Sequence, residues 1–492
     1  MPAPITIRNL TAQPLTVKLV ERYEAPNPKD FPPNAGFSVS QLKSNISTGW
    51  DNITNKAPNN VQLGEKAQSF TKEDVDVRME PFTTHKTQIK TTERGPNEIL
   101  RLTFQGDGGA RWRIDTPTPS TESQKLVPLN PDPKHDYTAI YFPTADFLAL
   151  YESTHLQCWM KYLLDSTPLS ALSIPGTHNS PTCHKALPSV RCQAVSPREQ
   201  LENGVRFFDI RVQPDDPNDP KNEELILVHG AFPISLTGSK KFRDLVNDVQ
   251  EFLRANPSET LVMSVKREGT GDATDQHLST ILKDHYTNPR EWWTQPHVPT
   301  LGEARGKIVL MRRFALADRL KNEWNGKGWC LNAENWAYNT PNCHHGDVIV
   351  QDFCEVLDTE NIDHKIKLCC DHFERAGAQS TPVIKPDDNK PVPSPGPLFL
   401  NFLSASNFWS KSCWPEKIAA KLNPAVKTFL CQQHDIGDKG ADGAAGEVAK
   451  GDGGVGVVVC DWVGEDGDWD LVRCVVGMNA RLLLRQKGIG WR

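Results

Sequence analysis

The sequence LSIPGTHN at residues 172–179 is a short apolar run that ends in a histidine, His178, followed by an amide side chain. The run LILVH at residues 225–229 ends in the same way, in His229. Short apolar runs bounded by turn residues are typical of buried β-strands. Where such strands lie in parallel, their C-terminal ends meet at one edge of the sheet, so the two imidazoles are predicted to lie close together.

A third run, VRFFDIR at residues 205–211, places Asp209 and Arg211 on one face of a strand, because side chains two residues apart point the same way. Two imidazoles, a carboxylate and a guanidinium suit phosphoryl chemistry. One imidazole can accept a proton from an attacking hydroxyl, the other can protonate the leaving group, and the guanidinium can bind charged phosphoryl oxygens. Either histidine alone would be interpreted as a structural residue of the core, and only the joint pattern favours a catalytic site.

Eight short apolar runs follow from residue 169 onward, and several precede amphipathic helical patterns, most clearly at residues 242–254. This alternation predicts an α/β fold, an irregular (β/α)8 TIM-type barrel with its active site at the C-terminal ends of the strands. Only about a dozen residues join the second and third runs, too few for a helical crossover, so one helix is expected to be missing. The runs are residues 171–177, 205–212, 225–229, 260–267, 307–314, 347–353, 397–405 and 456–463.

Residues 1–145 have a different pattern from the second domain, residues 155–490. Polar and apolar residues alternate in short segments separated by Pro, Asn and Gly, which predicts an N-terminal all-β, sandwich-like domain of antiparallel strands. Its role stays open between a docking module and a packing scaffold. Residues 25–65 are predicted to form a long loop, and the Gly-rich residues 435–456 a solvated insertion in the barrel domain.

Charge and hydropathy narrow the partners of this chain. A net charge of −6 and a pI near 6.2 argue against a nucleic-acid partner. No apolar run reaches the roughly eighteen residues of a membrane span, and residues 1–9 lack the apolar core of a secretory signal. A cytoplasmic location with peripheral membrane contact is therefore expected, while nothing in the sequence indicates an oligomeric state.

The twelve cysteines are scattered between Cys158 and Cys474 without a Cys-x-x-Cys pair. This distribution favours mostly buried free thiols. A local disulfide between Cys183 and Cys192 stays possible, and so does a zinc site, although its potential ligands lack close paired spacing. Those potential ligands are Cys330, Cys343, His344, His345, Cys369, Cys370 and His372.

Together, the motifs IPGTH (174–178), RFFDIR (206–211) and VHG (228–230) resemble the X-type catalytic domain of bacterial and fungal phosphatidylinositol-specific phospholipases C. The resemblance extends over about residues 155–490, the size of one barrel domain. It implies cleavage of phosphatidylinositol-type lipids to diacylglycerol and a cyclic inositol phosphate, with no cofactor. The family's barrel is also irregular.

The resemblance also implies roles for particular residues. His178 is the expected general base for the inositol 2-hydroxyl, oriented by Asp461, and His229 is the expected general acid for the diacylglycerol oxygen. Calcium-dependent relatives place carboxylates around a metal ion, whereas here Arg211 follows Asp209 and supplies a fixed positive charge. The enzyme is therefore predicted to be metal-independent.

Weaker matches concern the inositol ring. Lys266 and Arg313 lie where the family binds inositol hydroxyls, although either could be an ordinary ion pair, and Asp352 resembles another inositol contact. Two positions depart from the family pattern. Asn179 replaces an aspartate that helps the general acid, so a slower acid step is expected, and Cys354 replaces a tyrosine that would stack on the sugar.

Many aromatic residues lie outside the strand runs and suit either docking to a bilayer or core packing. A peripheral contact with a lipid surface is the partner they favour. Two alternative functions stay open: a lipid-binding protein with weak or no catalysis, and another barrel phosphodiesterase, disfavoured because an early metal-ligand pattern is missing. The aromatic residues are Phe232, Trp292, Trp293, Trp324, Trp329, Trp336, Phe408, Trp409 and Trp414.

Overall fold

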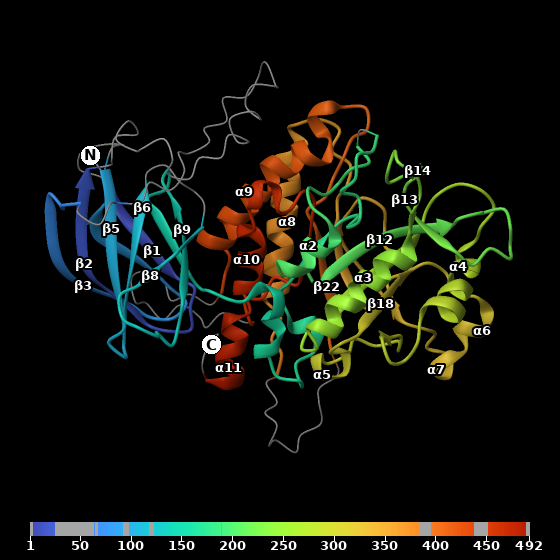
Figure 1. Ribbon diagram of the computed structural model, residues 1–492, viewed down its shortest axis with the longest axis horizontal. Helices are drawn as coiled ribbons and strands as arrows, with labels where there is room; N and C mark the ends of the chain where they lie inside the picture. Colours follow the sequence, from blue (N-terminus) through green and yellow to red (C-terminus); the bar gives the residue numbers. More distant parts are fainter. Residues whose placement is uncertain are drawn as a thin grey trace. The chain divides into compact units, whose positions relative to one another are not determined.

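The computed structural model describes residues 3–24, 63, 67–91, 98–117, 123–187, 189–382, 395–436 and 451–488. These residues form two compact units, and the chain passes from the first to the second between Tyr151 and Glu152 (Figure 1). Most of the predicted loop at residues 25–65 and of the Gly-rich insertion at residues 435–456 lies outside the described residues.

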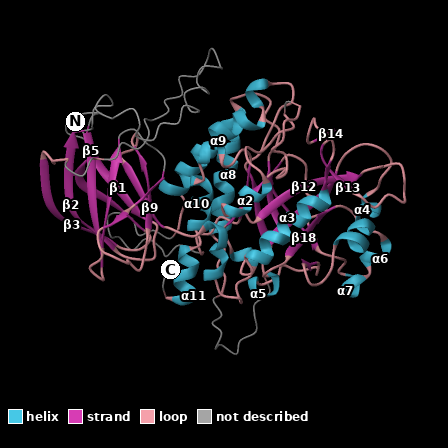
Figure 2. Cartoon of the chain, in the orientation of Figure 1, coloured by secondary structure: helices cyan, strands magenta, loops and turns pink. Residues whose placement is uncertain are grey.

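In its described residues the first unit contains β-strands and no helix (Figure 2). Its described strands are β1 (Pro4–Asn9), β2 (Leu15–Glu24), β3 (Thr71–Met79), β4 (Thr83–Lys90), β5 (Glu98–Gly106), β6 (Arg111–Pro117), β7 (Ser123–Lys125), β8 (Val127–Pro128), β9 (Tyr137–Phe142) and β10 (Phe147–Glu152). They form two five-stranded sheets, in the orders β4-β1-β10-β9-β7 and β3-β2-β5-β6-β8. Alternate apolar side chains of both sheets, such as Ile7 and Leu102, meet in one core.

The pairing in this unit differs in one place from the antiparallel prediction. β1 pairs with β10 in parallel, with Thr6 opposite Phe147, whereas β1 and β4 are antiparallel. β1 and β10 are the first and last strands of the unit, so no hairpin joins them and parallel pairing is open to them.

The second unit contains a curved sheet whose main strands run in parallel (Figure 1). These strands are β11 (Ile174–Thr177), β12 (Phe207–Pro214), β16 (Leu261–Arg267), β18 (Ile308–Arg313), β19 (Leu331–Asn332), β21 (Val348–Asp352), β22 (Leu398–Phe402) and β23 (Val457–Cys460). Their order is β19-β18-β16-β12-β11-β23-β22-β21, with every neighbouring pair parallel. Between the outer strands β19 and β21 the described residues show only an isolated backbone hydrogen bond, Asp347 N–H to Asn332 O at 2.9 Å, and no ladder. The unit is therefore mixed α/β with a partial barrel.

One predicted barrel strand is wrong. Residues 225–229 form β13 (Leu225–His229), which pairs antiparallel with β12, with Val212 opposite Leu227. The short connection allows a hairpin but not a crossover, which explains the missing helix. The two-residue strand β19 takes the vacated place in the parallel order. Because β13 runs back along β12, its last residue, His229, returns to the level of Ile210 at the C-terminal edge of the sheet.

Minor strands flank this sheet, and helices pack against it. The minor strands are β14 (Phe232–Pro233), β15 (Lys240–Lys241), β17 (Trp292–Trp293) and β20 (Thr340–His345). The helices are α2 (Pro197–Glu202), α3 (Phe242–Ala255), α4 (Asp275–Ile281), α5 (Leu301–Ala304), α6 (Asp318–Lys321), α7 (Glu323–Gly326), α8 (Asn361–Gly377), α9 (Pro415–Gln432), α10 (Asp470–Gly477) and α11 (Ala480–Lys487). None of the helices in the described part of the chain is long and apolar enough to cross a membrane.

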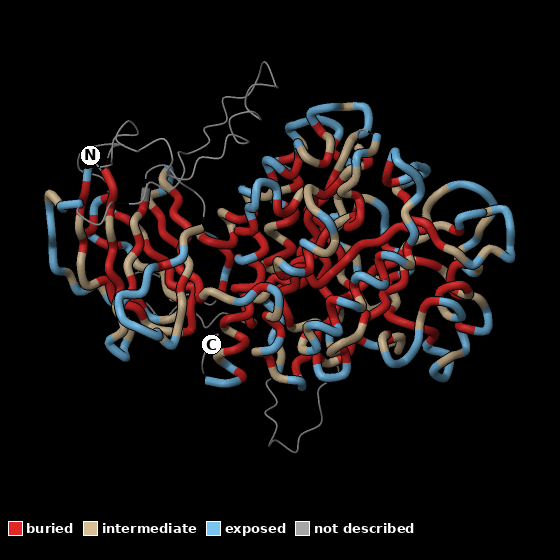
Figure 3. Tube along the Cα trace, viewed as in Figure 1, coloured by how far each residue is buried: buried red, intermediate tan, exposed pale blue. Residues whose placement is uncertain are grey.

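Helix α3 shows why these segments fold as they do. Its apolar residues recur every three or four positions, and Phe242, Val249 and Phe252 on that face are fully buried. The main parallel strands of the second unit are buried along most of their length (Figure 3), as expected for parallel strands covered by helices. This rigid sheet carries the side chains at its C-terminal edge.

Candidate active site

The C-terminal edge of the sheet brings the predicted site residues into one region. Most of them lie in the last half of a strand or just after it, because the strands are parallel and β13 returns to the same edge. Asp209 is the third residue of β12, but it lies just past the level at which the neighbouring strand β11 ends. Contacts join most of them into one network, described below. By strand they are His178 and Asn179 after β11, Asp209 and Arg211 in β12, His229 at the end of β13, Lys266 in β16, Arg313 at the end of β18, Asp352 at the end of β21, and Asp461 after β23.

His178 is oriented by a buried carboxylate. Its Nδ1 donates a hydrogen bond to Oδ1 of Asp461 at 2.9 Å, and the Asp461 side chain is only 4% exposed. This contact fixes the proton on Nδ1 and leaves Nε2 as the nitrogen that can accept a proton. Burial disfavours the charged ring, but the carboxylate of Asp461 and the thiol of Cys192 outweigh it and raise the pKa of His178 above its ordinary value.

His229 faces His178 across the edge. The two rings are 6.1 Å apart between centroids and perpendicular. Nδ1 of His229 donates to the carbonyl oxygen of Val190 at 2.8 Å, so Nε2 is the nitrogen that can carry a transferable proton. Burial lowers the pKa of His229, but the neighbouring Cys192 more than offsets it and the net pKa is raised.

Asn179 contacts His178, the predicted base, through its side chain. Its Nδ2 lies 3.1 Å from Nε2 of His178 and 3.8 Å from Sγ of Cys192. The residue has φ of +41°, a left-handed backbone conformation that asparagine tolerates better than most residues. Its Oδ1 is buried without a hydrogen-bond partner. The side-chain contacts of Asn179 are thus with His178 and Cys192, and none of them reaches His229, on which an effect was expected.

Arg211 is held between two carboxylates. Its Nη2 lies 2.7 Å from Oδ2 of Asp209, and its Nη1 lies 2.5 Å from Oε1 of Glu268. Burial opposes ionisation of Asp209, but Arg211 and then Arg313 outweigh it and lower the pKa of Asp209 to about 2. The carboxylate is therefore charged at neutral pH and fixes both guanidinium groups.

Arg313 connects Asp209 to Trp336, which in turn contacts Asp352. Its guanidinium lies 3.7 Å from the centroid of the Trp336 ring, and its Nη1 lies 3.4 Å from Oδ1 of Asp209. Trp336 Nε1 donates to Oδ2 of Asp352 at 3.0 Å. Burial, and next the charge of Arg211, lower the pKa of Arg313 to about 10, which still leaves it cationic at neutral pH. Trp336 supplies an aromatic face near Asp352, where the expected tyrosine is Cys354.

Glu268 is a site residue that the sequence analysis missed. It accepts hydrogen bonds from Lys266 Nζ at 3.0 Å and from the backbone N–H of Gly230 at 2.8 Å, in addition to its contact with Arg211. Lys266 is therefore ion-paired as well as exposed to the edge, with 38% of its side chain accessible. The signal for Glu268 was its position two residues after Lys266, which places both on one face of an extended segment.

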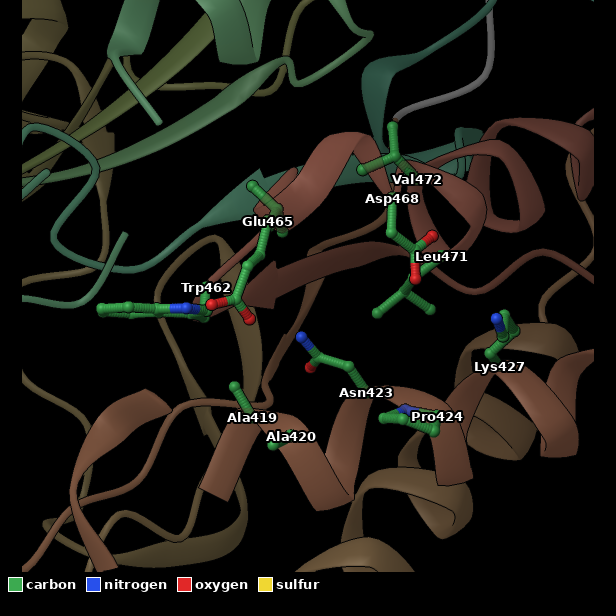
Figure 4. Close-up of a pocket in the computed structure, with 11 residues that line it drawn as sticks. Ala419, Ala420, Asn423, Pro424, Lys427, Trp462, Glu465, Asp468, Leu471 and Val472 are labelled. Carbon is green, nitrogen blue, oxygen red and sulfur yellow. The ribbon is translucent and has the colours of Figure 1, made fainter. Parts of the chain in front are cut away.

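A cavity of about 200 Å³ lies between α9 and the segment that follows β23 (Figure 4). Asn423 of α9 lines this cavity and donates from Nδ2 to the carbonyl oxygen of Asp461 at 3.0 Å. Trp462, with φ of +55°, also lines the cavity. The Cζ atom of Arg191 lies over the Trp462 ring, 4.7 Å from the ring centroid. The backbone of Asp461 is thus held by Asn423 while its carboxylate contacts His178.

All twelve cysteines are free thiols, so the possible disulfide between Cys183 and Cys192 is not formed. The zinc hypothesis for residues 330–372 is not supported either. Within the described ranges, the one group of three potential ligand side chains close enough to share a metal ion is His178, Cys192 and Asp461. Nothing in the sequence indicated that Cys192 lies next to the predicted site residues, because it belongs to the long connection between β11 and α2.

Exposed aromatic side chains gather at two of the loops on this edge. Phe232 of β14 stacks on Phe408, which follows β22, with ring centroids 6.3 Å apart and an interplanar angle of 2°. Trp409 packs edge-on against Phe408 and is 90% exposed. We call Phe232, Phe408 and Trp409 the apolar rim. Other tryptophans of the predicted aromatic set are core residues, namely Trp292, Trp293 and Trp329.

Comparison with known proteins gives a consistent similarity. Residues 165–314 match the family model "Phosphatidylinositol-specific phospholipase C, X domain". The chain is 31% identical over 283 residues to the 1-phosphatidylinositol phosphodiesterase of Listeria monocytogenes, covering 55% of this chain and 74% of that protein. It is 28% identical over 281 residues to the enzyme of the same name from Staphylococcus aureus, covering 54% and 81%. The solved structure of the Listeria phospholipase aligns with 66% of this chain and 99% of that one, at 21% identity and a TM-score of 0.46.

Proposed function

Because this chain belongs to the family of phosphatidylinositol-specific phospholipases C, we propose that it cleaves phosphatidylinositol to diacylglycerol and a cyclic inositol phosphate. The observation that carries the proposal is the opposed pair of imidazoles, His178 on Asp461 and His229 on the Val190 carbonyl, beside a fixed guanidinium. The second unit is then the irregular (β/α)8 TIM-type barrel of that family, with β13 as its antiparallel departure.

The geometry supports an intramolecular displacement. The neutral Nε2 of His178 takes the proton of the inositol 2-hydroxyl, whose oxygen forms a bond to phosphorus while the bond from phosphorus to the diacylglycerol oxygen breaks. The protonated Nε2 of His229 gives its proton to that leaving oxygen. Asp461 keeps the His178 ring in the required tautomer and stabilises its cationic form. The substrate hydroxyl must displace the amide of Asn179 from Nε2.

Arg211 is proposed to bind the phosphoryl oxygens. Its contacts with Asp209 and Glu268 use three of the five N–H groups of the guanidinium and hold it in place, which leaves the others for the phosphate. A guanidinium does not lose its charge in the working pH range. It can therefore supply the charge stabilisation that calcium gives in metal-dependent relatives.

The apolar rim supports a peripheral contact with a lipid surface. The substrate lies in a bilayer, and exposed Phe and Trp side chains at the edge of the site can insert into the interface between headgroups and acyl chains. Lys266, Arg313 and Asp352 are proposed to bind inositol hydroxyls beneath this rim. The exact headgroup, with a free or a substituted inositol, follows from the product analysis below.

Phosphorus NMR of the reaction with phosphatidylinositol vesicles tests the proposal. We expect the five-membered cyclic phosphate signal to appear before any acyclic inositol phosphate. His178→Ala and His229→Ala should each lower turnover by at least about a hundredfold, the usual contribution of a positioned base or acid. Folded protein that binds vesicles without forming product would instead establish a lipid-binding protein without catalysis.

The same reaction run with EGTA or EDTA tests the role of Arg211. We expect the rate to survive chelation, because the positive charge beside the phosphate is covalently part of the chain. A loss of activity that added calcium restores would show that a metal ion, and not Arg211, performs this task. Magnesium-buffered chelator serves as the control for effects on the vesicles.

A further inference from the structure

The proposed general base, His178, and two of its neighbours together offer a set of metal-ligand atoms. Asp461, Cys192 and a ring nitrogen of His178 offer ligand atoms that all lie within 4.8 Å of one another. One carboxylate, one thiol and one imidazole are the ligand types that zinc combines in proteins. We propose that this trio is an inhibitory binding site for zinc and other thiophilic divalent cations.

The required movement is small. Ligand atoms at a tetrahedral zinc ion, with bonds of about 2.0–2.3 Å, are separated by about 3.3–3.8 Å. The longest separation in the trio must therefore shorten by up to about 1.5 Å, which side-chain rotations can supply without moving the strands. The side chain of His178 is 18% exposed, whereas Cys192 and Asp461 lie buried beneath it, so a cation would enter beside the imidazole.

The backbone holds Cys192 in position for this role. Its N–H donates to Oγ1 of Thr182 at 3.0 Å, and its carbonyl oxygen accepts from the N–H of Trp462 at 2.8 Å. The Sγ is thereby fixed between the loop after β11 and the residue next to Asp461. Pre-positioned ligands with supporting hydrogen bonds are what raises the affinity of a metal site.

The charges near Cys192 favour a metal-ready thiol. Burial and Asp461 raise the pKa of Cys192, but His229 and His178 outweigh them and lower it. Sγ lies 3.9 Å from Nδ1 of His229, whose proton is held by the Val190 carbonyl, so His229 is a neighbour of the site and not one of its ligands. A metal ion replaces the proton at such a thiol and gains the thiolate as a ligand.

Occupation of this site would stop the proposed reaction. A zinc ion bound by Asp461 and His178 breaks the hydrogen bond that orients the His178 ring. It also occupies a lone pair of the imidazole or forces the ring into its other tautomer, so the ring no longer acts as the proposed base. Hard cations should not do this, because calcium and magnesium prefer oxygen ligands and disfavour thiolate. Metal binding itself does not depend on the proposed function, whereas its inhibitory effect rests on it.

A direct binding measurement comes first. Titration of the full chain with cobalt(II) should produce a thiolate-to-cobalt charge-transfer band, and zinc should abolish it by competition. Cys192→Ala should lose the band, whereas Cys354→Ala, which removes a half-buried thiol outside the trio, should keep it. An identical band in the full chain and in Cys192→Ala would overturn the proposal, and so would the absence of any band.

Activity is then measured in zinc buffers, as the ratio of rates with and without zinc within each variant. Cys192→Ala should raise the zinc concentration for half-inhibition by at least about tenfold, since even loss of a supporting contact costs a metal site that much. Calcium at roughly a hundredfold higher concentration should leave the ratio unchanged in the full chain. Equal zinc sensitivity of Cys192→Ala and the full chain would overturn the proposal. Should the chain show no lipid cleavage at all, the proposed function fails while the cobalt band still decides the metal site.

Discussion

His178 shows how a single ring acquires its role from its neighbours. Nδ1 is bound by Asp461, Nε2 faces the Asn179 amide, and Cys192 lies close to both the ring and His229. The proposed base must be neutral to accept a proton, so the raised pKa of His178 would restrict the proposed reaction to pH values above that pKa. In the proposed mechanism, the same carboxylate that orients the ring therefore also sets the acidic limit of activity.

Asp461→Asn tests that dual role. The variant removes the charge that holds the pKa of His178 up, so the acidic limb of the pH–rate profile should move to lower pH. The rate on the plateau should fall by about a hundredfold, because the ring loses its fixed tautomer and the stabilisation of its cation. The measurement is kcat/KM on a soluble inositol phosphodiester across pH. An acidic limb that stays in place would show that another group controls it.

Asn179→Asp separates an effect on the base from an effect on the acid. A carboxylate at 3.1 Å from Nε2 would hold His178 protonated, so the acidic limb should move to higher pH and neutral-pH rates should fall. Natural lipid and an aryl inositol phosphodiester should slow by the same factor, because both need the base.

The matched control is Asn179→Gly, which suits the positive φ and adds no charge. Its acidic limb should not move upward. Faster lipid cleavage by Asn179→Asp, with the aryl substrate unchanged, would contradict this expectation and show that residue 179 assists the general acid.

At the scale of elements, the antiparallel arm β12–β13 is the feature that completes the site. A parallel strand would leave its C-terminal residue at the edge after a long crossover, whereas the hairpin returns His229 directly beside β12. Glu268, after β16, ties this arm down by accepting from the backbone N–H of Gly230 and from Arg211. The position of His229 therefore depends on a contact between two separate strands.

Glu268→Ala tests this tie. The variant frees the N–H next to His229 and one side of Arg211, so turnover should fall by about tenfold or more, the scale of a lost charged hydrogen bond. In a His229→Ala background the same change should cost less, since part of its effect acts through that imidazole. Equal costs in both backgrounds would assign the whole effect to Arg211. Glu251→Ala, at an exposed carboxylate of α3, is the control.

The same arm shows what the sequence could predict. Periodicity and strand-end residues located β11, β12, β16, β18, β21, β22 and β23, and with them the predicted site residues. The apolar pattern of a buried strand is the same whether the strand pairs in parallel or antiparallel. The sequence therefore did not show that β13 is antiparallel, and β13 was predicted as a parallel barrel strand. Cys192 and Glu268 were missed because their roles arise from contacts over long sequence separations, to His229 and to Gly230.

At the scale of the whole molecule, the chain combines an all-β unit with a unit that carries the site and the apolar rim. The rim is formed by loops after β13 and β22, so the elements that position the chemistry also position the exposed aromatics. The proposed docking through this rim would bring the headgroup of a lipid substrate to the two histidines. The role of the all-β unit stays open between a docking module and a packing scaffold, since none of the predicted site residues belongs to it.

Phe408→Ala combined with Trp409→Ala tests docking through the rim. A fully buried aromatic side chain contributes about 1.5–3 kcal/mol of transfer free energy, so binding to phosphatidylinositol vesicles should weaken by at least about tenfold. Cleavage of vesicle lipid should fall in parallel, while a monomeric soluble inositol phosphodiester should be cleaved at an unchanged rate. Trp324→Ala, which removes an exposed tryptophan of α7 outside the rim, is the matched control and should bind vesicles normally. Equal losses on the soluble and the vesicle substrate would show that Phe408 and Trp409 support the structure of the site, and docking would have to be assigned to another surface.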